Sequence, residues 1–127
     1  MIYGVGTDVV EIGRVKKVLE RFGERFARRI LCPPELRRFK NHRFKASYLA
    51  KRFAAKEAFS KALGTGIRAP ANWHGVWVVN LPSGKPELQF SDDLRKLLAK
   101  RQISSAHLSL ADEQGIAFAT VILECEK

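Results

Sequence analysis

Residues 52–66 read RFAAKEAFSKALGTG, and this stretch predicts the end of a long central helix. From Ala46 to Leu63 the chain has no Gly or Pro and is rich in Ala, which favours a helix throughout. Gly64 stands where helices commonly end in a left-handed conformation. With about 3.6 residues per turn, apolar side chains fall on both sides, so we expect this helix to lie inside the fold.

Glu57 and Lys61 lie one turn apart on this helix and point from a side made of small and apolar residues. One interpretation is an ordinary ion pair on a helix surface, which contributes only about 0.2–0.5 kcal/mol. The other is a functional pair, because a charge placed among alanines needs a partner or a metal ion.

Asp8 supplies a second acidic position. Ile2 to Val5 predicts a short apolar strand that ends at Gly6, and Asp8 follows it closely. A carboxylate at the end of a strand can hold a divalent cation, and magnesium prefers such hard oxygen ligands. Together with Glu57, Lys61 and the Gly-rich exit of the helix, Asp8 indicates a site for phosphate and magnesium.

The remaining segments alternate between helical and strand patterns. Ser91 is expected to cap a helix, with acidic residues in its first turn. The predicted helices are Glu11 to Phe22, Glu24 to Ile30, Pro33 to Lys40 and Ser91 to Arg101; the predicted strands are Val76 to Leu81, Glu87 to Phe90, Ala106 to Leu110 and Ile116 to Glu124, the last two joined across residues 112–115. This order predicts an α+β fold, a single compact domain over residues 1–127, whose sheet is largely antiparallel.

The composition sets limits on the function. The formal net charge of +10 implies an anionic partner: a nucleic acid, an acidic protein or a phosphorylated small molecule. No apolar run is long enough to span a bilayer, and the first residues do not resemble a signal peptide, so we expect no membrane partner. Cys32 and Cys125 lack metal-ligand spacing, which favours reduced thiols in a cytoplasmic protein.

Five cations step by three or four residues along the helical segments that follow Asp8. They are Arg14, Lys17, Arg21, Arg25 and Arg28, and they form one stripe if Gly23 does not rotate the helix face. The stripe is either a solvated surface or a docking surface for an acidic helix. No aromatic residues alternate with the charges, which disfavours a base-specific nucleic-acid site.

Two weaker signals remain. Glycines at 64 and 66 would let backbone N–H groups approach a phosphate, although a helix end alone explains Gly64. Strand alternation places His107 on the face opposite Leu108 and Leu110. A lone His on a strand is more often simply exposed, yet its near-neutral titration suits phosphate binding or proton transfer.

Four segments, in chain order, carry a resemblance to a known family. They are GVGTDVVEIGR (4–14), RFAAKEAFSKALGTG (52–66), GKP (84–86) and HLSLADEQGIAFATVIL (107–123). Together they resemble the holo-acyl-carrier-protein synthases, the small bacterial branch of the 4'-phosphopantetheinyl transferases. The resemblance extends over essentially the whole chain.

This resemblance implies a reaction and its residues. Such enzymes move 4'-phosphopantetheine from coenzyme A to a serine of apo-acyl carrier protein and release adenosine 3',5'-bisphosphate. By resemblance, Asp8 and Glu57 hold Mg²⁺, Glu57 and Lys61 are the catalytic pair, and Lys61 contacts the phosphates. Binding of coenzyme A is further assigned to Arg52, Gly64, Thr65 and His107. The base that accepts the serine proton stays open between a metal-bound water and Glu57 acting through a water.

The resemblance also implies partners. The acidic acyl carrier protein is expected to dock on the basic helix, mainly at Arg14 and Arg21, in support of fatty acid biosynthesis. A homotrimer is expected, with active sites between subunits. Apolar residues of the last strand (Ile116, Phe118, Val121, Leu123) fit either a subunit contact or an ordinary sheet core. A basic nucleic-acid-binding domain and a metal-dependent phosphoesterase are the alternatives; the first lacks a stacking signature and the second lacks further acids.

Overall fold

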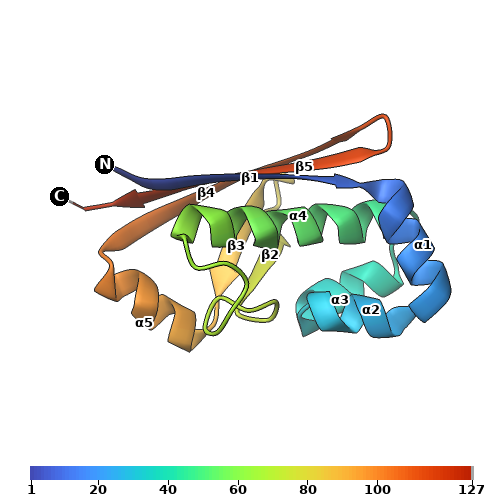
Figure 1. The fold of residues 1–127 in the computed structure, drawn as a ribbon, viewed down its shortest axis with the longest axis horizontal. Helices are drawn as coiled ribbons and strands as arrows, with labels where there is room; N and C mark the ends of the chain where they lie inside the picture. Colours follow the sequence, from blue (N-terminus) through green and yellow to red (C-terminus); the bar gives the residue numbers. More distant parts are fainter. Residues whose placement is uncertain (127) are drawn as a thin grey trace.

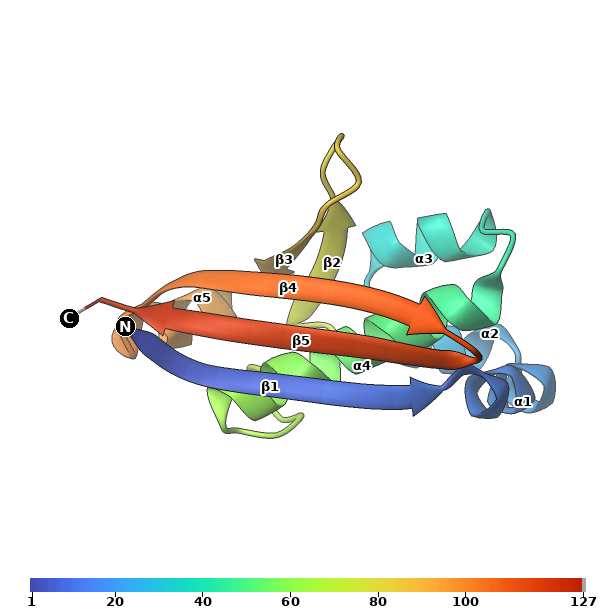
Figure 2. The same ribbon diagram turned by 90° about the horizontal axis from the view of Figure 1, so that it is seen from above.

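A three-stranded antiparallel sheet covers one side of the long helix that carries Glu57 (Figures 1 and 2). These elements are seen in a computed structural model, which describes residues 1–126. The sheet has the order β1 (Ile2–Glu11), β5 (Ile116–Cys125), β4 (Ile103–Glu113), and the central helix is α4 (Lys45–Leu63). The expected α+β class with a largely antiparallel sheet is confirmed.

The other elements pack along α4 (Figure 1). Near its start lie α1 (Ile12–Phe22), α2 (Glu24–Ile30) and α3 (Pro33–Lys40); beside its middle lies the hairpin of β2 (Val76–Asn80) and β3 (Pro86–Phe90), and toward its end lies α5 (Asp92–Lys100). Ser91 caps α5 as predicted, since its hydroxyl accepts a hydrogen bond of 3.2 Å from the N–H of Leu94. The helices expected from the sequence therefore all form, with small shifts at their ends.

The prediction that the first strand ends at Gly6 is wrong. Strand β1 runs to Glu11, and Asp8 lies within it, opposite Ala119 of β5. Glycine in a strand suggested an end, but here it permits a close approach of two backbones. A Cβ at Gly4 would lie 2.0 Å from the carbonyl oxygen of Ala62, and one at Gly6 would lie 1.9 Å from that of Ala58.

The last hairpin is also longer than predicted. Strands β4 and β5 continue to Glu113 and from Ile116, so only Gln114 and Gly115 form the turn. Both have positive φ, at 51° and 79°, which matches the twist of a two-residue hairpin. This geometry extends the ladder through residues that had been predicted to form the turn.

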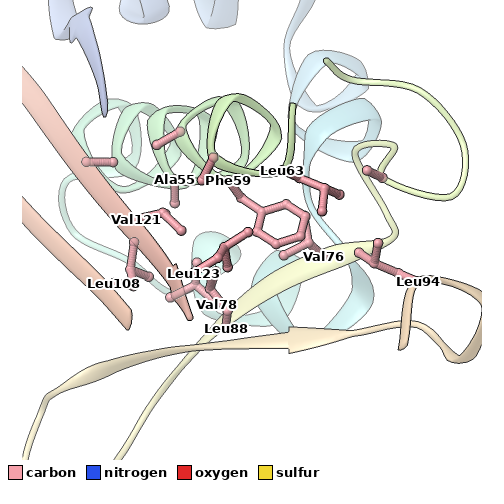
Figure 3. Close-up of a cluster of buried hydrophobic side chains, with 14 of the residues drawn as sticks. Ala55, Phe59, Leu63, Val76, Val78, Leu88, Leu94, Leu108, Val121 and Leu123 are labelled. Atoms are coloured by element: carbon pink, nitrogen blue, oxygen red, sulfur yellow. The ribbon is translucent and has the colours of Figure 1, made fainter. Parts of the chain in front are cut away.

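The core forms where α4 meets the sheet and the β2–β3 hairpin. Phe59 lies among side chains from several elements (Figure 3), and the members labelled there are Ala55, Leu63, Val76, Val78, Leu88, Leu94, Leu108, Val121 and Leu123. A second cluster packs α1, α2 and α3 against the first half of α4. The predicted burial of α4 is confirmed, because most of its residues are buried.

A buried ion pair joins these two regions. Lys56 and Glu35 are both fully enclosed, with 2.7 Å between Nζ and Oε1. The Lys56 ammonium also donates to the carbonyl oxygens of Ile30 and Trp73, and Glu35 accepts from the N–H groups of Cys32 and Val78. Breaking one partner of such a pair costs about 3–5 kcal/mol, so it fixes the rotation of α4, with Lys56 inward and its neighbour Glu57 toward the α1 side.

The apolar residues of β5 that the sequence analysis considered together lie on two faces of the sheet. They therefore do not form one contact surface or one core face. Val121 and Leu123 are fully buried against α4, whereas Phe118 is 40% exposed on the opposite face. Val9 of β1 pairs in register with Phe118 and is 56% exposed, and Val5 is 57% exposed. The outer face of the sheet therefore carries apolar side chains that the described chain leaves uncovered.

Two further expectations concern the cysteines and membranes. Cys32 and Cys125 are both free thiols, as predicted. Burial raises the pKa of the Cys32 thiol to about 11. Within residues 1–126, no helix combines the length and apolar character needed to cross a membrane.

Candidate active site

The carboxylates of Asp8 and Glu57 line one pocket of about 450 Å³ between β1, α1 and α4. Asp8 projects toward α4 because it shares the inner face of β1 with Gly4 and Gly6. Glu57 comes from the exposed edge of α4, next to the inward-facing Lys56. The close β1–α4 approach that the glycines permit therefore brings together two acids 49 positions apart in the chain.

The electrostatics of the pocket suit a cation. Burial, and next the negative charge of Asp8, raise the pKa of Glu57, while Lys61 acts in the opposite direction. Two carboxylates that repel each other favour a divalent ion between them, and hard oxygens are the ligands Mg²⁺ takes. No group of three or more His, Cys, Asp and Glu side chains occurs among the described residues, so phosphate oxygens and water would supply the remaining ligands.

Lys61 reaches across to β1 rather than along its own helix. Its ammonium donates to Oδ1 of Asp8 and to the carbonyl oxygen of Thr7, both at 3.0 Å. No ion pair joins Glu57 to Lys61 in the described part of the chain, so the interpretation as an ordinary helix-surface pair is wrong. Lys61 therefore joins the site through Asp8, although it does not line the pocket itself.

Of the five cations in the predicted stripe, Arg14 lines the carboxylate pocket itself. Arg25 borders an adjoining hollow of about 420 Å³, which shares Val18 and Phe26 with that pocket. Arg21 lies over the ring of Phe22, with 5.1 Å to its centroid. Arg14 and Arg25 thus flank a surface that runs from the carboxylates along α1 and α2.

Gly23 divides the stripe. It has φ 62° and ψ −146° and separates α1 from α2. Arg28 pairs with Glu24 at 3.2 Å and lines a different hollow, beside Arg37 and Lys40. Arg28 is thereby set apart from Arg14, and Lys17 is an exposed residue of α1 that lines neither the carboxylate pocket nor the Arg25 hollow.

The residues predicted to bind coenzyme A do not gather in this pocket. Arg52 is only 5% exposed; it donates to Oδ1 of Asn80 at 2.8 Å and lies 4.1 Å over the Tyr48 ring. Burial lowers the pKa of Arg52, and its Nε has no hydrogen-bond partner. His107 lies on the outer face of the sheet and contacts Glu124.

The loop after α4 lies close to Lys61 in sequence but does not line the pocket either. Gly64 ends the helix in the left-handed conformation, with φ 87°. The Thr65 hydroxyl donates to the carbonyl oxygen of Gly66. Within one chain, the structure therefore unites Asp8, Glu57, Lys61 and Arg14, and leaves Arg52, His107 and this loop at other positions.

Some residues of the site were missed by the sequence analysis. Glu11 and Phe53 line the pocket, and Phe53 is held by Trp73, with 5.0 Å between ring centroids. Phe53 precedes Glu57 by four residues, so helical spacing predicts both on one side of α4, although not that Phe53 belongs to the site. The support from Glu35 through Lys56 to Trp73 depends on contacts between distant segments, which no local pattern shows.

Comparison with known proteins adds to this geometry. The family model of the 4'-phosphopantetheinyl transferase superfamily matches residues 4–120. A holo-[acyl-carrier-protein] synthase of Pseudoalteromonas atlantica is 52% identical over 123 residues, which are 97% of each chain. The crystal structure of such a synthase from Neisseria meningitidis is similar with a TM-score of 0.94 and 44% identity, covering 98% of this chain and 99% of that one. Another, from Helicobacter pylori in complex with coenzyme A, has a TM-score of 0.83 and 32% identity, covering 94% of this chain and 99% of that one.

The fold, the paired carboxylates and these similarities define a class. The chain belongs to the 4'-phosphopantetheinyl transferase superfamily. Within that superfamily it is an enzyme of the holo-[acyl-carrier-protein] synthase family.

Proposed function

We propose that this enzyme transfers the 4'-phosphopantetheine of coenzyme A to a serine of apo-acyl carrier protein, with Mg²⁺ as cofactor. The products are holo-acyl carrier protein and adenosine 3',5'-bisphosphate, and residues 1–127 act as one domain, in the cytoplasm, in support of fatty acid biosynthesis. The observation that carries the proposal is that Asp8 and Glu57 line one pocket and that Lys61 donates to Asp8, in a chain of this family. The Helicobacter pylori relative solved with coenzyme A supports the choice of donor.

Each residue of the site has a role in this proposal. Asp8 and Glu57 would hold Mg²⁺, which when bound supplies positive charge to the diphosphate. Lys61 carries a half-exposed ammonium, 51% by side chain, on a stem long enough to follow the phosphates. Its charge stabilises the oxygens on which negative charge develops during transfer. The attacked hydroxyl belongs to the carrier protein, so the chain needs no nucleophile of its own.

A homotrimer is the proposed assembly. The uncovered apolar residues Val5, Val9 and Phe118 on the outer face of the sheet support a contact between subunits. His107 lies on the same sheet face, so such a contact would bring it toward a neighbour's site, where it would bind a nucleotide phosphate. Arg52, Gly64 and Thr65 also remain proposed contacts of coenzyme A, on the basis of the resemblance to the family. Light scattering at micromolar concentration should give three times the mass of one chain.

The basic surface of α1 and α2 is the proposed docking site of the acidic carrier protein. Reversal of Arg14 and Arg21 to Glu should raise the KM for carrier protein by about 10- to 100-fold, because both charges then repel the partner. Arg21→Glu alone should leave the affinity for coenzyme A, measured by calorimetry, nearly unchanged, because Arg21 does not line the carboxylate pocket. Added salt should weaken docking of the unmodified enzyme, since exposed charges are screened beyond about 8 Å at physiological ionic strength.

The matched control reverses Lys96 and Lys100 of α5, at the other end of the molecule (Figure 1). That variant carries the same change in net charge and should keep the KM of the unmodified enzyme. An equal rise in KM in both variants would attribute the effect to net charge and would remove α1 from the docking proposal.

The reaction itself is tested by mass spectrometry of apo-acyl carrier protein incubated with the enzyme, coenzyme A and Mg²⁺. The expected result is a mass gain of one phosphopantetheinyl group that disappears when the metal is chelated. If folded enzyme modifies no carrier protein but binds polynucleotide or hydrolyses phosphoesters, one of the two alternative functions replaces the transferase.

A further inference from the structure

The Lys61 ammonium and the proposed metal ion would both bind the carboxylate of Asp8. The Lys61 ammonium donates to Oδ1 of Asp8 at 3.0 Å, and a second bond of 3.0 Å, to the carbonyl oxygen of Thr7, holds it against β1. We propose that Lys61 is an internal competitor of the metal ion: it weakens metal binding until the diphosphate of coenzyme A draws its ammonium off Asp8. This inference rests on the proposed function, because it takes Asp8 as a metal ligand and a diphosphate as substrate.

The surroundings of the pair make the competition effective. The Asp8 side chain is only 16% exposed, so solvent screens its contact with Lys61 less than it screens a pair on an open surface. Glu57, the other acid of the site, has no ion-pair partner among the described residues. Lys61 is thus the one cation that the described structure pairs with either acid, and a dication that uses both acids meets its positive charge at Asp8.

The Lys61 side chain is also free to move. Its exposed fraction of 51% and its flexible stem let the ammonium leave Asp8 without disturbing the buried side of α4. A bound diphosphate offers the ammonium several charged oxygens in exchange for one carboxylate and one carbonyl. A ligand shifts such an equilibrium by its difference in affinity for the two positions, so coenzyme A and metal should each tighten the binding of the other.

The test is a titration of the full-length protein with Mn²⁺ as the probe, in the absence of coenzyme A. Lys61→Met keeps the length of the side chain and removes its charge, so it should bind Mn²⁺ about three- to tenfold more tightly than the unmodified protein, the range expected for a partly buried ion pair. Lys51→Met is the matched control on the same helix, since Lys51 pairs with Asp112 and not with Asp8. Its Mn²⁺ affinity should stay within about twofold of that of the unmodified protein.

A second titration, with saturating coenzyme A, separates competition from a general charge effect. Coenzyme A should tighten Mn²⁺ binding by a larger factor in the unmodified protein than in Lys61→Met, because only the former has an ammonium to remove from Asp8. Equal factors in the two proteins, or unchanged or weaker Mn²⁺ binding by folded Lys61→Met in the first titration, would overturn the inference.

Asp8→Asn distinguishes this failure from a failure of the proposed function. If Asp8→Asn weakens Mn²⁺ binding and Lys61→Met does not strengthen it, the metal site stands and the competition is wrong. If Asp8→Asn binds Mn²⁺ as tightly as the unmodified protein, the metal site itself is wrong, and the inference fails with it.

Discussion

Replacing Glu57 with Gln, or Asp8 with Asn, is expected to slow phosphopantetheinyl transfer by about a thousandfold or more, while the protein stays folded. Each amide keeps the volume of the carboxylate and loses the charge that the proposed Mg²⁺ requires. Both side chains line one pocket, so neither variant opens a cavity in the core. The rate is measured by mass spectrometry of the carrier protein under single-turnover conditions.

The control for this loss is the exposed Glu87 of strand β3, which lies outside the pocket. Glu87→Gln should transfer at the rate of the unmodified enzyme. Retention of activity in both Asp8→Asn and Glu57→Gln would remove the metal site from the mechanism, whatever the carrier protein used. Loss of transfer activity in only one of the two variants would keep that acid as a metal ligand. Groups other than the second acid would then have to supply the remaining ligands.

The same Glu57→Gln variant should be more stable than the unmodified protein at neutral pH. Burial and the charge of Asp8 raise the pKa of Glu57 in the folded state, so ionised Glu57 destabilises the fold. This cost is fully present above the raised pKa of the folded protein and disappears as the pH falls below the ordinary value of 4.5, where the carboxyl is protonated in both states. Melting temperatures at pH 8 and at pH 4 measure the difference; a variant less stable than the parent at pH 8 would contradict it.

Local patterns were sufficient to predict much of this protein. Helix α4 could be predicted because a long segment without Gly or Pro ends at Gly64. In the structure Gly64 ends the helix with φ 87°. The capping Ser91 and the paired last strands have similarly local signals. Glu57 and Lys61 attracted notice because charges on a buried helix require an explanation, and the structure gives one in Asp8.

The features that could not be predicted depend on contacts between distant segments. No local pattern predicts the burial of Lys56, whose ammonium is fully enclosed by Glu35 and two carbonyl groups. An ion pair of Lys61 along its own helix was one of two interpretations, and the position of β1 decides that its ammonium meets Asp8. The environment of Arg52 within one chain, between Tyr48 and Asn80, likewise depends on a distant segment, and its contact with coenzyme A stays a prediction.

Gly6→Ala should strongly destabilise the fold, because the added methyl group has no room against α4. The new Cβ would lie 1.9 Å from the carbonyl oxygen of Ala58 and 2.7 Å from the backbone nitrogen of Ala62. Both atoms belong to the backbone of α4, which cannot move as a side chain would. We expect a loss of about 3 kcal/mol or more in the free energy of unfolding, and a fall of about 10 °C or more in Tm.

Gly13→Ala is the matched control for Gly6→Ala. Gly13 lies within α1, and a Cβ there would meet nothing within 4 Å. The same substitution should therefore raise stability by about 0.4–1 kcal/mol, because alanine favours a helix and restricts the unfolded chain. Thermal unfolding compares the two variants with the unmodified protein. The changes in Tm have opposite signs if the close β1–α4 contact is correct, and the same sign if it is not.

The Gly6 variant also tests how the fold produces the site. Gly6 precedes Asp8 by two residues on the same face of β1, so any outward shift of the strand carries the Asp8 carboxylate away from Glu57 and Lys61. Below its lowered Tm, the folded fraction of Gly6→Ala should accordingly bind Mn²⁺ more weakly and transfer more slowly than Gly13→Ala. The close contact of Gly6 with the backbone of α4 holds Asp8 near Glu57, although the two acids are far apart in the chain. Gly6 is therefore as necessary to the proposed metal site as the two carboxylates are.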